Sequence, residues 1–238
     1  MRWMMLIALS VLVACDVQTT TTQRPQQTAS APQISDQEAR SRAGIAARQF
    51  VSVVETVEPI AERECERRAP NVNCDFQIVV DDRPGQPPNA FQTVDRSGRP
   101  ILAFNLALIA SVSNADELAF VMGHEAAHHV LGHLARTQQN AAVGAVILSG
   151  LAALGGADAA GVESAERVGA SLGARTYSKD FELEADQLGT IITARSGYNP
   201  IRGAQFFNRI PDPGNRFLGT HPPNAARMEI VRRTAAGL

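Results

Sequence analysis

The chain has 238 residues, is 45% hydrophobic, and carries a formal net charge of −2 at pH 7. This length suffices for one domain with a well-filled core. The near-neutral charge and the lack of a basic patch with interleaved aromatic residues exclude nucleic acid as the expected partner.

Residues 1–14 predict a secretory signal peptide. Arg2 gives a basic start, and the apolar stretch of about a dozen residues that follows is too short to span a membrane. Leu12-Val13-Ala14-Cys15 resembles a bacterial lipobox, which implies cleavage before Cys15 and attachment of lipid to it. The alternative is an ordinary signal peptide followed by a chance cysteine. We therefore expect a lipid-anchored protein facing the periplasm of a Gram-negative bacterium, with the choice between inner and outer membrane left open.

Residues 15–33 predict a lipidated N-terminus and a flexible tether. From Val17 onward this stretch is rich in threonine, glutamine and proline and poor in large apolar side chains. Removal of residues 1–14 takes away only one charged side chain, Arg2, so 21 basic and 24 acidic residues remain. The globular domain is expected at residues 34–238.

Two further cysteines, Cys65 and Cys74, bracket a short loop. An exported protein meets oxidising conditions, so the pair predicts a disulfide, with free thiols as the alternative. A thiolate metal site is not expected, because no further cysteine is present to complete it.

The pattern over the domain favours an α+β fold that is mostly helical. A long helix is expected to begin at Ser35-Asp36-Gln37-Glu38 and to break at Pro59. Short strands are expected at residues 76–80, 90–94 and 101–104, between turns rich in proline and glycine. From Leu106 onward the pattern is helical, which places a small sheet beside the helix that carries the motif described next.

The most informative motif is His124-Glu125-Ala126-Ala127-His128. A cap at Ser113-Asn114 and apolar residues at helical spacing place it in the middle of a helix. Histidines four positions apart lie on one face of a helix and can share one Zn²⁺ ion. Glu125 lies about 100° round the helix, beside the open coordination position, where it can take a proton from water. The motif therefore predicts a zinc metallopeptidase with one zinc ion per chain.

A third protein ligand is needed, and the sequence offers a carboxylate or His221. Glu182 is the best carboxylate, and Asp186, four residues later on a predicted helix, can accept the other ring N–H of a zinc-bound histidine. An acidic solvated helix face is the alternative for both residues, and Glu184 fits that role. His133 is expected to be a packing or hydrogen-bonding residue at the helix end. His221 is either near the zinc or simply a loop histidine held between Thr220 and Pro222.

Residues 141–174 are rich in alanine and glycine and contain an apolar run at 143–154. This run is shorter than a bilayer span. It predicts either a mobile lid or membrane-touching hairpin over the cleft, or a helical hairpin packed closely through small residues.

Four blocks between Pro88 and Met228 resemble a known family, the HtpX and CAAX-prenyl-protease type of gluzincin metallopeptidase. They are similar above all to its small periplasmic lipoprotein subgroup, which includes the catalytic domain of BepA, here expected without a tetratricopeptide repeat domain. In sequence order the blocks lie at residues 89–101, 114–128, 177–186 and 220–228. The resemblance implies Glu182 as the third zinc ligand, Asp186 behind a ligand histidine, and His221 near the metal, either assisting catalysis or capping the zinc.

The resemblance also implies a substrate class, namely unfolded or misassembled envelope proteins. A sheet edge along the zinc cleft would hold such a polypeptide through main-chain hydrogen bonds. Two other functions stay open: a largely latent, chaperone-like binder with a capped zinc site, and a structural zinc protein. Glu125 argues against the structural site, because a closed site needs no base.

Overall fold

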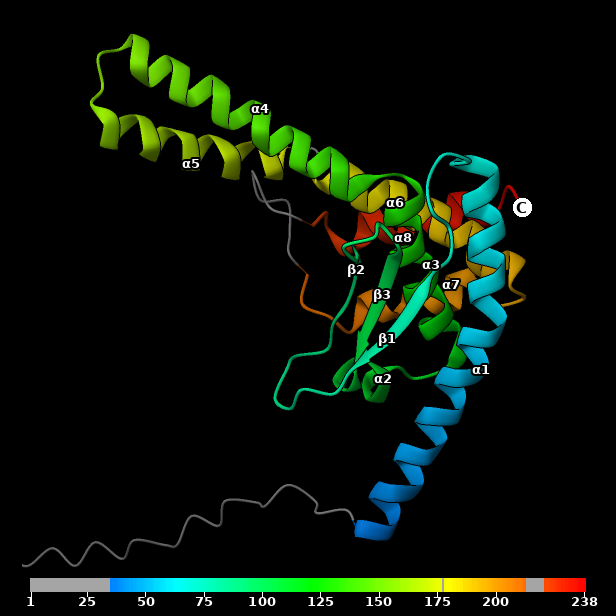
Figure 1. Cartoon of the computed structure of the whole chain (residues 1–238). Coiled ribbons are helices and arrows are strands. Elements are labelled where there is room, and N and C mark those ends of the chain that lie inside the picture. Colours follow the sequence, from blue (N-terminus) through cyan, green and yellow to red (C-terminus); the bar gives the residue numbers. More distant parts are fainter. Residues whose placement is uncertain (1–34, 177, 213–220) are drawn as a thin grey trace, which may run out of the picture. The chain divides into compact units, whose positions relative to one another are not determined.

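The computed structural model describes residues 35–176, 178–212 and 221–238 (Figure 1). The predicted signal peptide, the lipid attachment at Cys15 and the tether lie outside these residues. The strands are β1 (Gln77–Asp81), β2 (Ala90–Val94) and β3 (Pro100–Asn105), and the helices are α1 (Asp36–Arg68), α2 (Leu106–Ser111), α3 (Ala115–Val130), α4 (His133–Leu154), α5 (Ala159–Arg175), α6 (Ser178–Arg195), α7 (Pro200–Gly203), the 3₁₀ helix η1 (Ala204–Asn208) and α8 (Asn224–Ala235).

The sheet has three strands in the order β1-β3-β2, with β3 parallel to β1 and antiparallel to β2. The central strand β3 is buried along most of its length, and its Leu102 and Phe104 belong to the main core. Strand β2 pairs only with β3 among the described residues, so its other edge is available for a further strand. The α+β prediction is confirmed, and all three predicted strands agree with the structure to within one residue at each end.

Helix α1 runs without a break through Pro59, so the predicted break is wrong. Proline removes one backbone hydrogen bond from a helix and usually kinks it. Here Val53, Val57 and Ala61 lie four residues apart and are all buried in the core, so packing on both sides of the proline maintains the helix. In the last turn of α1, Cys65 is joined by a disulfide to Cys74, which lies in the loop after the helix.

Helices α3 and α6 pack against each other at an unusually short distance. A methyl group added to Gly189 would lie 2.9 Å from the backbone nitrogen of His124, and one added to Gly123 would lie 2.9 Å from the carbonyl oxygen of Gly189. Only glycine at both positions permits this approach. The contact brings the middle of α3 next to the middle of α6.

Helices α4 and α5 form a hairpin that packs mainly on itself (Figure 1). Gly144 faces Gly169 so closely that a methyl group on Gly144 would lie 2.2 Å from the Gly169 carbonyl oxygen. This is the close packing through small residues that was one of the two alternatives for this segment. Among the described residues, no helix combines the length and the hydropathy that a membrane crossing requires.

The α3–α6 contact generates a stability prediction. We expect Gly189→Ala to lower the free energy of unfolding by about 1–3 kcal/mol, because its methyl group has no space against the backbone of α3. The measurement is urea denaturation, monitored by circular dichroism.

The matched control is Gly150→Ala in the exposed part of α4, where an added methyl group meets no atom within 4 Å. This change should raise stability by about 0.5–1 kcal/mol, since alanine favours a helix over glycine. Equal effects of the two substitutions would show that the α3–α6 approach is not constrained by Gly189.

Candidate metal centre

Helix α3 positions the two histidines of the 124–128 motif. The helix begins where the Asn114 side chain accepts a hydrogen bond from the Glu117 backbone N–H at 3.1 Å, an N-cap of the expected kind. One turn separates His124 from His128, and the Nε2 atoms of both imidazoles face Glu182. Their Nε2 atoms lie 3.0 Å apart. His124 is buried and His128 is half-buried.

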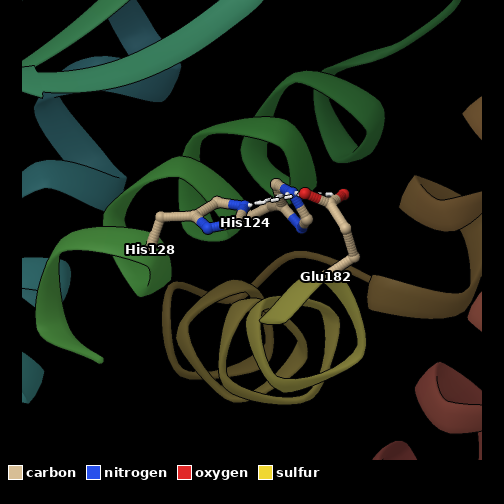
Figure 2. Close-up of side chains that lie close together, drawn as sticks. All are labelled: His124, His128 and Glu182. Carbon is tan, nitrogen blue, oxygen red and sulfur yellow. Dashed lines mark hydrogen bonds and ion pairs between the residues drawn. The ribbon is translucent and has the colours of Figure 1, made fainter. Parts of the chain in front are cut away.

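Glu182 approaches the two histidines from α6 (Figure 2). Its Oε2 lies 3.6 Å from His124 Nε2, and its Oε1 lies 3.5 Å from His128 Nε2. Each of the three residues offers one donor atom within 4.8 Å of the other two. Atoms that ligate a tetrahedral zinc ion at 2.0–2.1 Å lie ~3.3 Å from one another. Two imidazoles and one carboxylate at these separations therefore fit a catalytic zinc ion.

The electrostatics of the three residues suit a cation. Burial disfavours a charge on Glu182, but hydrogen bonds to His124, His128 and His221 outweigh burial and hold the pKa of this carboxyl well below its usual range. Burial likewise disfavours a charge on His124, yet its contacts with Asp186 and Glu182 raise the pKa of the imidazole to about 10. Both shifts reflect the mutual attraction of carboxylates and imidazoles: the histidines favour the charged form of Glu182, and the carboxylates favour the charged form of His124.

Asp186 lies behind His124, one helical turn after Glu182. Its Oδ1 is 2.9 Å from His124 Nδ1, so the carboxylate can accept the ring N–H and leave Nε2 free for a metal. The side chain is completely buried, and Arg227 of α8 donates two hydrogen bonds to it at 2.7 Å. These two charge-assisted hydrogen bonds pair the buried carboxylate with a guanidinium. The sequence alone assigned no role to Arg227, although this residue lies within the family-like block at residues 220–228.

Glu125 and His221 line the same cavity, whose volume is about 810 Å³, as do His124, His128, Glu182 and Arg227. Glu125 is half-buried, on the wall next to the paired histidines. His221 is 56% exposed, and its Nδ1 lies 3.3 Å from Glu182 Oε2. The structure therefore places His221 beside the candidate metal-binding residues.

The interpretation of Glu184 as a solvated acid is incomplete, because the side chain is 41% exposed but also contacts two side chains of α4. Its Oε2 lies 3.0 Å from Nε2 of His133, and the same oxygen accepts a hydrogen bond from Arg136 at 2.7 Å. His133 is buried, and its other nitrogen, Nδ1, lies 2.8 Å from His128 Nδ1. Helical periodicity could not reveal this contact, because Gly132, with φ of 66°, ends one helix and starts the next between the two histidines.

Comparison with known proteins agrees with this geometry. Residues 47–235 match the model of peptidase family M48. The beta-barrel assembly-enhancing proteases of Yersinia pestis and of Escherichia coli O157:H7 are each 30% identical to the chain over 151 residues, which cover 54% of this chain and 29% of each relative. The mitochondrial metalloendopeptidase OMA1 of Saccharomyces cerevisiae is 27% identical over 171 residues, which cover 66% of this chain and 46% of OMA1.

The chain thus spans less than half of the length of each of these relatives. The matched range nevertheless includes α3 and α6 in full, together with Arg227 of α8. The family match covers most of the chain and includes every residue that lies around the candidate metal centre, so the chain belongs to peptidase family M48, a family of metallopeptidases.

Proposed function

We propose that this protein is a zinc-dependent endopeptidase that hydrolyses unfolded or misassembled proteins of the cell envelope. His124, His128 and Glu182 would hold the metal, and Glu125 would act as the general base. The observation that carries the proposal is the convergence of two imidazoles and one carboxylate within 4.8 Å of one another, in a cavity that Glu125 also lines. A structural zinc site would have no use for such a cavity or for a base beside it.

A zinc ion bound by these residues would polarise the scissile carbonyl group and make a water molecule more acidic. Glu125 takes the proton from this attacking water and then delivers it to the leaving amine. Asp186 would hold His124 in the tautomer that leaves Nε2 free for a metal, and Arg227 fixes the position of Asp186 through two hydrogen bonds. The side chains of the protein therefore account for orientation and for proton transfer.

The edge of β2 is the proposed binding site for an extended polypeptide. Asn89, Ala90, Phe91 and Gln92 line the same cavity as His124 and Glu125. A substrate that adds to this edge as a further strand is held through main-chain hydrogen bonds, which are largely independent of sequence. Only a chain that is locally unfolded can offer its main chain in this way. The names of the bacterial relatives, which refer to beta-barrel assembly, support envelope proteins as the substrate class.

The proposed location follows from the N-terminal sequence. A lipid on Cys15 would attach the protein to a membrane, and residues 15–33 would tether the peptidase domain on the periplasmic side. The bacterial relatives, being proteases of beta-barrel assembly by name, are consistent with the envelope of a Gram-negative bacterium.

A second candidate function is a largely latent binder of unfolded envelope proteins with a capped zinc site. The position of His221, 3.3 Å from a carboxylate oxygen of Glu182, favours it. An imidazole at this position can reach the ligand set, and as a fourth protein ligand it would displace the attacking water.

The first prediction of this proposal concerns Glu125. We expect Glu125→Gln to retain zinc, because Glu125 is not among the three converging ligands, and to lower turnover by about 10²–10⁴-fold through loss of the general base. Casein cleavage and metal analysis of the purified protein measure the two effects. In the wild type, a chelator should abolish cleavage and added zinc should restore it. Substantial cleavage by the glutamine variant would contradict the assigned role.

The second prediction separates the two candidate functions. If His221 caps the metal, His221→Ala should raise the rate of casein cleavage, because the variant frees a coordination position. If the site is already open and His221 assists the reaction, the same change should lower the rate. A rate that does not change would remove His221 from both roles. Zinc content must be measured in parallel, so that a lost metal is not mistaken for a lost catalytic group.

A further inference from the structure

His128 has a partner on the side of its ring that faces away from Glu182. Its Nδ1 lies 2.8 Å from Nδ1 of His133, and Nε2 of His133 lies 3.0 Å from Oε2 of Glu184. The same oxygen of Glu184 accepts a hydrogen bond from Arg136. These contacts form a continuous path from a metal-facing histidine of α3, through the first turn of α4, to a carboxylate of α6.

The proposed metal ligation determines where the protons of this path lie. His128 must present the lone pair of Nε2 to the metal, so its proton is on Nδ1 and is donated to His133. His133 accepts this hydrogen bond at the lone pair of its Nδ1. Its own proton is then on Nε2, which donates a hydrogen bond to the carboxylate of Glu184. One arrangement of donors and acceptors satisfies every member of the path. Exchange of either tautomer would leave two N–H groups or two lone pairs facing each other.

The path is also held rigidly. His133 is 3% exposed, and its ring stacks on Phe181 with centroids 4.7 Å apart and planes 10° apart. The guanidinium carbon of Arg136 lies 4.1 Å from the centroid of the same phenylalanine ring, so two side chains of α4 pack on Phe181. A side chain fixed in this manner can hold its neighbour in one orientation at little cost in conformational entropy.

The two metal-facing histidines are thus supported in parallel ways. His124 contacts Asp186, whose charge is paired with Arg227. His128 contacts Glu184 indirectly through His133, and the charge of Glu184 is paired with Arg136. In metal sites, a partner on the outer nitrogen fixes the ring and commonly changes affinity by about 10–100-fold.

We propose that His133 is a positioning residue that orients His128 for the metal, and that Glu184 fixes the tautomer of His133. The inference rests on the proposed function, because it assumes that His128 is a ligand. It adds two residues to the site, and it makes the first turn of α4 part of the metal centre.

The test is the zinc dissociation constant of the full chain, measured by competition with a chromogenic chelator. His133→Phe keeps the ring and its stacking on Phe181 but removes the acceptor, and it should weaken zinc binding by about 10–100-fold. The visible absorption of the Co²⁺-substituted protein should change with it, because the imidazole of His128 is no longer fixed. His133→Asn, whose side-chain oxygen can accept a hydrogen bond where Nδ1 does, should recover most of the affinity.

His129→Phe is the matched control, since His129 is a half-buried histidine next to His128 whose Nε2 contacts the backbone oxygen of Asn73 instead of His128. It should change zinc affinity by less than about twofold, because it leaves the outer nitrogen of His128 paired. Circular dichroism establishes that each variant is folded. Should His133→Phe fail to fold, Glu184→Ala replaces it, because this half-exposed residue tolerates truncation, and a several-fold loss of affinity is expected.

The outcomes separate the inference from the function on which it rests. A wild-type chain that binds no zinc would overturn both. Tight zinc binding by the wild type, with equal affinity and an unchanged Co²⁺ spectrum in His133→Phe, would overturn the positioning role alone. The same holds if asparagine at position 133 is no better than phenylalanine, since a general packing defect would then explain the loss.

Discussion

The site depends on the close approach of two helices. Gly123 of α3 and Gly189 of α6 leave no space for a side chain between them, so the backbones of the two helices meet near His124. This contact determines which part of α3 lies opposite Glu182 and Asp186. Glu182 then faces the Nε2 atoms of both histidines, and Asp186 faces Nδ1 of His124. A wider spacing would separate the carboxylate from the imidazoles by more than one metal ion can span.

Paired charges hold the surrounding elements to these two helices. Arg227 fastens α8 to Asp186, Arg209 pairs with the buried Glu117 of α3, and Arg195 of α6 pairs with the buried Glu64 of α1. Removal of one partner from such a pair is destabilising, since it leaves an uncompensated charge in the interior. Among the described residues, every buried side-chain nitrogen or oxygen has a hydrogen-bond partner. The helices that carry the site are therefore held by polar contacts as well as by the apolar core.

The same arrangement places the candidate metal centre beside the proposed binding site for a polypeptide. Strand β2 lies at the edge of the sheet, and its residues share one cavity with the paired histidines. The main chain of a bound strand would meet the general base without a dedicated pocket for each side chain. On this view, selectivity depends on the accessibility of the substrate backbone, which suits a peptidase that acts on unfolded proteins. The α4–α5 hairpin is connected to this centre through His133 and Arg136 at its first turn.

Local patterns in the sequence determined the metal-binding motif, its helix and the three strands, because spacing along one element fixes which side chains share a face. Spacing along a helix marked Glu182 and Asp186 as candidates, and the family resemblance implied their roles, but their meeting with α3 required the tertiary contact at Gly123 and Gly189. The continuity of α1 through Pro59 was missed because packing of buried residues on both sides outweighs the local cost of proline. The partners Arg227 and Glu184 came only from the structure, since charges from separate helices become neighbours through packing, which no spacing along the chain encodes.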